Sequence, residues 1–294
     1  MNRREFLNIC TSGAIAAPLA AGIGYSLKKP DAQSIEKKET SFERVLRTGV
    51  LRCAYAAYTP SVIIDPNTRQ LSGIFYELTT LIGHHLGLKV EWVEEVDYGL
   101  IPQGFKTGRY DLFGGAVWPI SERSKVSNFT SPVYISPVGV YVRADEKRFT
   151  TVDSINDPAC RIAVHEGDIQ DSIARSSFPL ATRHAVPQMT STELMLEEIL
   201  TNKADATFVE PFFADSFMKH SPGALKNIAT SNPVRVFGNV MMFDNDDWRL
   251  KVMLDTALQE IQGTGIIPRL IEKYTGSPRT FFLIAKSYQE PKAL

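Results

Sequence analysis

From residue 50 onward, short apolar runs alternate with amphipathic segments, and this order constrains the fold more than any other feature. The predicted strands and helices follow one another at residues 50–55, 73–86, 89–93, 100–107 and 111–117. Leu78 and Ile82 share one face of the first predicted helix, and Gly87 provides its C-terminal stop. Strand, helix and strand in alternation predict a parallel sheet with helices on its faces.

A second α/β unit follows in the middle of the chain. Its predicted elements are a strand at 161–164, a helix at 169–174, a helix capped by Thr190 or Ser191 and a strand at 206–209. Residues 234–243 form an extended run that we interpret as a crossover, and helices at 247–261 and 266–274 close the chain. With 294 residues, the chain is long enough for two lobes of ordinary domain size.

The N-terminus has the pattern of an export signal. Arg3-Arg4-Glu5-Phe6-Leu7 opens the chain, and no further charge appears before Lys28. A paired arginine ahead of a moderately apolar stretch resembles a twin-arginine signal, so we assign residues 1–27 to export and 28–42 to a linker. A membrane anchor is the alternative, because residues 6–27 are just long enough to span. No cysteine ends the apolar stretch, which argues against a lipid anchor.

Charge and cysteine usage exclude several function classes. Lys and Arg total 32 and Asp and Glu total 33, so bulk electrostatic binding to nucleic acid or an anionic membrane is not expected. Cys53 and Cys160, the cysteines beyond the leader, lie far apart and have no metal-type spacing. We find no phosphate-binding glycine loop and no nucleophile elbow, and we expect neither cofactor nor metal.

Several short motifs together resemble the amino-acid-type periplasmic solute-binding proteins of the two-lobed, type II class. They are Tyr58-Thr59-Pro60, Gly108-Arg109-Tyr110-Asp111, Ser121-Glu122-Arg123, Phe129-Thr130-Ser131-Pro132, Ile162-Ala163-Val164-His165-Glu166-Gly167 and Lys203-Ala204-Asp205-Ala206. The resemblance implies two Rossmann-like α/β lobes joined by a two-strand hinge near 138–142 and 234–242. Lobe one would comprise 43–137 and 240–280, lobe two 138–239, and residues 281–294 a C-terminal tail.

The same resemblance implies two charged anchors for a small ligand. An arginine at the position of Arg123 binds the ligand's carboxylate in this family, and a planar guanidinium suits that task through two charge-assisted hydrogen bonds. A carboxylate at the position of Glu210 holds the ligand's ammonium. The alternatives are a surface arginine in a charged loop and an ordinary acidic residue before Pro211.

Two positions depart from the family pattern. Asp168 stands where Thr or Ser usually offers a hydroxyl to the ligand, and it could cap the following helix, contact the ligand or do both. Ile120 stands where Thr is common, although Ser121 could supply a hydroxyl instead. With Arg123, Asp168 and Glu210 ionised, the site would carry one net negative charge, which favours a ligand with a carboxylate and more than one cationic group.

Aromatic residues complete the expected site. Tyr58 and Tyr98 match positions where the family places rings around the ligand, and Trp118 lies at the mouth of the same cleft. Ring faces bury apolar area and tolerate cations, although rings in such positions can also be core residues.

The resulting hypothesis is a monomeric periplasmic protein that captures an amino-acid-like or carboxylate-bearing small molecule for an ABC transporter. A signalling receptor is an open alternative partner, since the lobes carry no readable docking motif. A cyclohexadienyl-dehydratase-like enzyme is the alternative from another class, with Glu210 or Asp168 as general acid. An accessory protein without a small ligand is a third possibility.

Overall fold

The computed structural model describes residues 39–187, 190–277 and 280–284. The predicted export signal, most of the predicted linker and residues 285–294 of the predicted tail lie outside this part of the chain. Within it, no helix has the length and apolar character needed to cross a membrane.

Lobe one is built on a mostly parallel sheet. Strands β1 (Val50–Tyr55), β4 (Lys89–Glu95) and β5 (Leu112–Val117) run parallel, and β12 (Arg235–Asp244) and β6 (Ser127–Phe129) add antiparallel strands. One face packs on helices α2 (Ile74–His85), α8 (Trp248–Gln262) and α9 (Ile266–Thr275), which contribute apolar side chains such as Leu78, Leu254 and Ile271. The other face packs on α3 (Ile101–Lys106) through Ile101 and Phe105. This is the helix-covered parallel sheet that the sequence predicts.

Lobe two repeats this architecture with a different strand order. Strands β8 (Arg161–His165), β9 (Thr182–Val186) and β10 (Ala206–Val209) run parallel, and β7 (Tyr134–Arg143) and β11 (Leu225–Asn227) are antiparallel additions. Helix α5 (Ile169–Ser177) covers one face. Helices α6 (Thr192–Leu200) and α7 (Pro211–Met218) cover the other.

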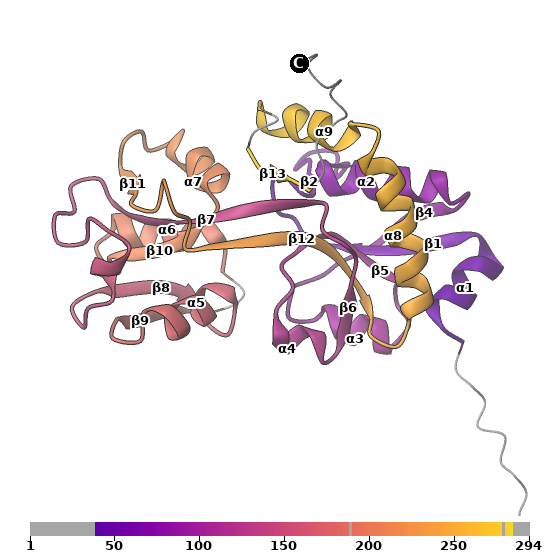
Figure 1. The fold of residues 1–294 in the computed structure, drawn as a ribbon, viewed down its shortest axis with the longest axis horizontal. Helices are drawn as coiled ribbons and strands as arrows, with labels where there is room; N and C mark the ends of the chain where they lie inside the picture. Colours follow the sequence, from indigo (N-terminus) through magenta and orange to yellow (C-terminus); the bar gives the residue numbers. More distant parts are fainter. Residues whose placement is uncertain (1–38, 188–189, 278–279, 285–294) are drawn as a thin grey trace, which may run out of the picture. The chain divides into compact units, whose positions relative to one another are not determined.

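Two long strands join the lobes. β7 and β12 lie side by side (Figure 1) and pair antiparallel from Tyr134 with Asn239 to Val138 with Arg235. Beyond this pairing, β7 continues along β10 in lobe two and β12 along β5 in lobe one. The structure therefore has the two-strand hinge expected of the type II fold. The shared segment begins a few residues earlier along β7 than the predicted 138–142.

An aspartate before a central strand has the same structural role in each lobe. Asp111 accepts hydrogen bonds from the backbone N–H and guanidinium of Arg52, and Asp205 does the same with Arg161. Burial alone would raise the pKa of Asp205, but hydrogen bonds from Arg161, joined by Arg148, hold it at about 2. The motif carboxylates Asp111 and Asp205 therefore belong to the frame of each lobe.

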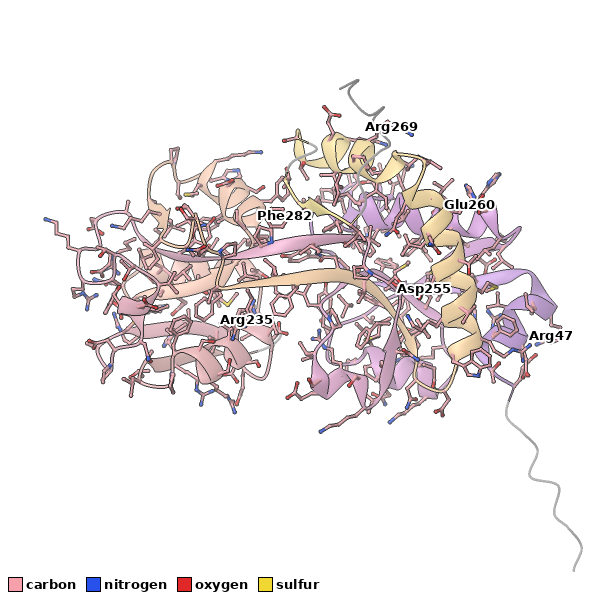
Figure 2. The ribbon with its side chains drawn as sticks, viewed as in Figure 1. Arg47, Arg235, Asp255, Glu260, Arg269 and Phe282 are labelled. Atoms are coloured by element: carbon pink, nitrogen blue, oxygen red, sulfur yellow. The ribbon has the colours of Figure 1, made fainter. Side chains whose placement is uncertain are left out.

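Several short elements were not predicted. Helix α1 (Ser41–Thr48) begins within the predicted linker, and a hairpin of β2 (Ile63–Ile64) and β3 (Leu71–Ser72) precedes α2. Also absent from the prediction are α4 (Ser121–Ser124), a 3₁₀ turn (Asp153–Ile155) and β13 (Phe282–Leu283). β13 lies within the predicted tail, but it pairs with β7 through Phe282 and Leu283 (Phe282 is labelled in Figure 2). The neighbouring Phe281 is buried and stacks on Tyr134 with ring centroids 4.3 Å apart, which holds this segment against lobe one.

Candidate functional site

A cleft of about 830 Å³ is lined by residues of both lobes. Its lining comes largely from the segments that follow strands β1, β4, β5, β8 and β10. Because parallel strands end at the same edge of a sheet, side chains distant in sequence converge there. Ligands of open α/β sheets bind at such carboxyl ends, so this cleft is the candidate site.

Glu210 lies at the lobe-two side of the cleft, directly after β10 and before Pro211. Its side chain is buried, and its Oε2 accepts a hydrogen bond from the Tyr58 hydroxyl of lobe one at 2.8 Å. Burial raises the pKa of Glu210, while hydrogen bonds from the Ser136 and Tyr58 hydroxyls counteract part of that rise. A carboxyl group in this setting can hold either a proton or a cationic partner.

The polar chain continues from Glu210 through the hinge. Asn239 of β12 donates from its amide nitrogen to the Ser136 hydroxyl of β7 at 2.6 Å. The same Asn239 accepts a hydrogen bond from the Trp118 indole N–H at 3.2 Å. Tyr58, Glu210, Ser136, Asn239 and Trp118 therefore form a single network that includes both lobes and both crossing strands.

Arg123 and Asp168 face each other from different lobes. Arg123 lies in helix α4, and one terminal nitrogen donates to the Trp118 carbonyl at 3.3 Å. Its other terminal nitrogen lies 3.4 Å from Asp168 Oδ1, with 20% of the arginine and 33% of the aspartate side chain exposed. The remaining N–H groups of a guanidinium stay available to an anion.

Aromatic rings line the cleft on several sides. Tyr58 stacks on Phe213 of α7, with centroids 6.0 Å apart and planes 5° from parallel. The Tyr98 hydroxyl donates to the Ala116 carbonyl at 3.3 Å, and burial raises the pKa of Tyr98. Trp118 stacks on Phe237 of β12 at 4.9 Å, so this ring packs on the hinge as well as lining the cleft.

The loop that carries Tyr58 depends on a glycine at the start of α2. The backbone N–H groups of Ile74 and Phe75 donate to the carbonyls of Pro60 and Ser61. Gly73 has φ of 117°, and a Cβ there would lie 2.4 Å from the Ser61 oxygen. Only glycine permits this approach, which fixes the loop from 58 to 62 against the helix.

The cleft is strongly acidic. Among the described residues, its lining contains a single arginine, Arg123, and five carboxylic acids: Glu95, Asp97, Asp168, Glu193 and Glu210. Glu95 is paired with Arg69 at 2.9 Å near the rim. In the same described ranges, no cluster of three or more His, Cys, Asp or Glu side chains has the arrangement of a metal site. Acidic side chains therefore outnumber basic ones in the described lining of the cleft.

Residues 51–277 match the bacterial extracellular solute-binding proteins, family 3. The chain belongs to this family. Among curated relatives, the probable histidine-binding protein of Campylobacter jejuni subsp. jejuni serotype O:2 is 24% identical over 208 residues, covering 70% of this chain and 77% of the relative. The cyclohexadienyl dehydratase of Pseudomonas aeruginosa is 22% identical over 174 residues, covering 58% of this chain and 63% of the enzyme.

Solved structures of similar proteins have the same fold. An ancestral amino acid-binding protein, described as a precursor of cyclohexadienyl dehydratase, superposes with a TM-score of 0.68 at 20% identity, covering 81% of this chain and 100% of that one. An amino acid ABC transporter substrate-binding protein from Streptococcus pneumoniae, bound to L-arginine, gives 0.66 at 20% identity, covering 80% and 98%. The family 3 chain thus has the two-lobed type II fold.

The structure brings six of the seven predicted site residues to one cleft. Tyr58, Tyr98, Trp118, Arg123, Asp168 and Glu210 line it. Ser121 does not, because it opens helix α4 with an exposed side chain and its carbonyl accepts a hydrogen bond from Ser124. Their contacts with a ligand stay predictions.

Of the two roles left open for Asp168, side-chain capping of α5 is absent from the structure. Asp168 occupies the N-cap position of α5, but its side chain makes no capping hydrogen bond and lies opposite Arg123 instead. Asp171, one turn into the helix, accepts the Gly167 N–H at 3.1 Å. The Asp171 carboxylate therefore accepts the loop's hydrogen bond, and the Asp168 side chain is available to line the cleft.

Sequence reasoning missed several polar residues of the cleft and its network, among them Ser136, Asn239, His165, Gln170 and the acids Glu95, Asp97 and Glu193. Ser136 and Asn239 interrupt otherwise apolar strands, and such an interruption is the signal that could have identified them. His165 ends β8, and its side chain is buried and lines the cleft.

Proposed function

We propose that this family 3 protein is an exported solute receptor that captures a cationic amino acid between its lobes. The observation that carries the proposal is the charge of the cleft, with five carboxylic acids and a single arginine among the described lining residues. Of these acids, Asp168 is half-buried and Glu210 is buried, and such charges need partners, so a ligand with more positive than negative groups stabilises this arrangement.

The proposed pose assigns one anchor to each lobe. Arg123 of lobe one binds the ligand's carboxylate through its free guanidinium N–H groups. Glu210 of lobe two binds the α-ammonium, which replaces the Tyr58 hydroxyl or shares the carboxylate with it. The cationic side chain then faces Asp168 and the acidic lining, while Tyr58 and Tyr98 enclose its apolar part.

The relatives are consistent with this ligand class. One relative is named a probable histidine-binding protein, and the Streptococcus pneumoniae structure is bound to L-arginine. From the paired arginine at the N-terminus and the family, we also propose that the chain acts in the periplasm after twin-arginine export and that it delivers its ligand to an ABC transporter. A sensory receptor is the alternative partner.

A binding screen tests the proposed ligand class. Arginine, lysine, histidine, glutamine, glutamate and putrescine are compared by thermal shift and then by calorimetry on the purified mature protein. A bound ligand raises the unfolding temperature by mass action. We expect stabilisation by at least one cationic amino acid and weaker effects from glutamine and glutamate. A preference for glutamate, or for putrescine over every amino acid, would refute the proposed pose.

An enzymatic function is the second candidate, and the raised pKa of Glu210 favours it. Burial raises the pKa of this carboxyl, and a carboxylic acid that keeps its proton can act as a general acid. The similarity to a cyclohexadienyl dehydratase points to elimination of water from a cyclohexadienyl substrate. The protein is incubated with prephenate and with arogenate, and formation of the product is measured by absorbance; this assay decides between the two functions. Turnover that Glu210→Gln abolishes would establish the enzyme.

A further inference from the structure

Two buried polar groups in the cleft have no assigned role. Four side-chain polar atoms in the described part of the chain are buried without a hydrogen-bond partner there: Trp92 Nε1, Ser127 Oγ, His165 Nε2 and Gln170 Oε1. Of these four residues, His165 and Gln170 line the cleft. Their side chains are 6% and 7% exposed.

Both residues reach the cleft from lobe two. His165 ends strand β8 and, by alternation along the strand, lies on the same sheet face as Ala163, which packs with Val186 and Met195 of α6. Gln170 lies in the first turn of α5, two residues after Asp168. The two residues therefore lie near the carboxyl end of β8, on the lobe-two side of the cleft.

Their burial without a partner requires a physical reason. A buried acceptor without a partner destabilises a protein, and apolar residues of similar size would remove that penalty. The presence of these polar residues is explained if the bound ligand supplies the missing hydrogen-bond partners. Gln Oε1 can only accept hydrogen bonds, and a neutral imidazole with its proton on Nδ1 accepts at Nε2. Both atoms then match N–H donors.

We propose that His165 Nε2 and Gln170 Oε1 form a specificity subsite that accepts hydrogen bonds from the N–H groups of the ligand's side chain. The subsite rests on the proposed function, since it reads the distal part of a cationic amino acid. It takes side chains that present two or more N–H donors, such as guanidinium, and it discriminates against apolar side chains of similar length. His165 is thus a specificity-determining residue rather than part of the core.

Calorimetry with a matched ligand pair tests the subsite. L-arginine and L-norvaline share the α-ammonium, the α-carboxylate and a three-carbon side chain, but only arginine has the guanidinium. We expect His165→Leu to weaken arginine binding about tenfold or more, as for a lost hydrogen bond to a charged group, and to change norvaline binding less than threefold. Gln170→Met should behave in the same way.

Three controls separate the possible outcomes. Ser127→Ala removes a buried unpartnered group outside the cleft lining and should leave both affinities unchanged. Arg123→Lys should weaken both ligands together, since both have the α-carboxylate. The unfolding temperature of unliganded His165→Leu should equal or exceed that of the wild type, which shows that the variant folds.

The two proposals fail in different ways. If the wild type binds no cationic amino acid, the proposed function fails, and the subsite fails with it. If the wild type binds arginine and Arg123→Lys weakens it, but His165→Leu and Gln170→Met keep the wild-type ratio of arginine to norvaline affinity, only the subsite is overturned. A falling unfolding temperature in both variants, with the ratio unchanged, would assign these side chains a structural role instead.

Discussion

Neutralising Asp168 tests how the cleft distinguishes cationic from neutral amino acids. Asp168→Asn keeps the shape of the side chain and removes its charge. In the structure Asp168 Oδ1 lies 3.4 Å from Arg123 Nη2, so a ligand carboxylate bound to Arg123 would lie close to a second carboxylate. That repulsion acts on every amino acid, whereas attraction to Asp168 acts only on ligands with a cationic side chain.

The expected magnitude follows from exposure. With 20% of the Arg123 and 33% of the Asp168 side chain exposed, solvent screens both effects, and each is worth about 1 kcal/mol. Loss of the repulsion should strengthen binding of a neutral amino acid about fivefold. For a cationic amino acid the lost attraction offsets the lost repulsion, so its affinity should stay within about twofold of the wild type.

Calorimetric titration with arginine and glutamine measures both affinities. The difference between the ligands should shrink at high salt, because half-exposed charges are screened. Glu197→Gln provides the matched control, since it removes an exposed acidic charge from α6 of the same lobe outside the cleft lining. An unchanged or weakened affinity for glutamine in Asp168→Asn would refute the assignment of Arg123 as a carboxylate anchor beside a competing Asp168.

Four further predictions follow from the charged groups. Arg123→Lys should weaken ligand binding by about 2 kcal/mol, or about thirtyfold, because an ammonium cannot make the two-point contact; unchanged calorimetric affinity would contradict this. Burial raises the pKa of Glu210, so the unliganded fold loses stability as the pH rises from the ordinary carboxyl range through the raised pKa. Glu210→Gln should remove that loss, and equal unfolding temperatures of variant and wild type at pH 8 would argue against it. Asp205→Asn should destabilise the fold by about 2 kcal/mol near neutral pH, measured by urea unfolding; the pKa of about 2 means that the wild type loses this contribution only as the pH falls towards 2. Changing Arg3 and Arg4 to Lys should leave precursor in the cytoplasm, detected by fractionation, whereas normal export would indicate the general secretory route.

The location of the cleft could be predicted because its lining residues directly follow the strands that define the fold. Tyr58, Trp118 and Glu210 all follow predicted strands, and parallel strands bring such positions to one edge. The resemblance supplied what periodicity cannot, namely that Arg123 in a charged surface loop faces the cleft. Local patterns alone fitted a solvated arginine equally well.

The parts that sequence could not predict depend on long-range pairing. The contact between Asn239 and Ser136 arises from the register of β7 against β12, and no local pattern encodes a pairing across about a hundred residues. The Asp168 side chain illustrates a competition between neighbours. Asp168 is a favourable N-cap residue and occupies the N-cap position of α5. Asp171 nevertheless accepts the hydrogen bond from the Gly167 N–H, and the Asp168 side chain lies opposite Arg123. Burial of His165 likewise required knowledge of what packs on the end of β8.

In the proposed pose, the positions of Arg123 and Glu210 would let a free amino acid, rather than either of its charged groups alone, join the two lobes. Arg123 belongs to lobe one and Glu210 to lobe two, so a ligand bound only by its carboxylate, or only by its ammonium, stabilises neither lobe relative to the other. In the proposed pose one molecule contacts both anchors, in addition to the Tyr58–Glu210 and Arg123–Asp168 contacts that already join the lobes. Glu210 also bonds Ser136, which bonds Asn239 on the second crossing strand. A cation bound at Glu210, as proposed, would therefore contact a hydrogen-bond network that continues through both crossing strands.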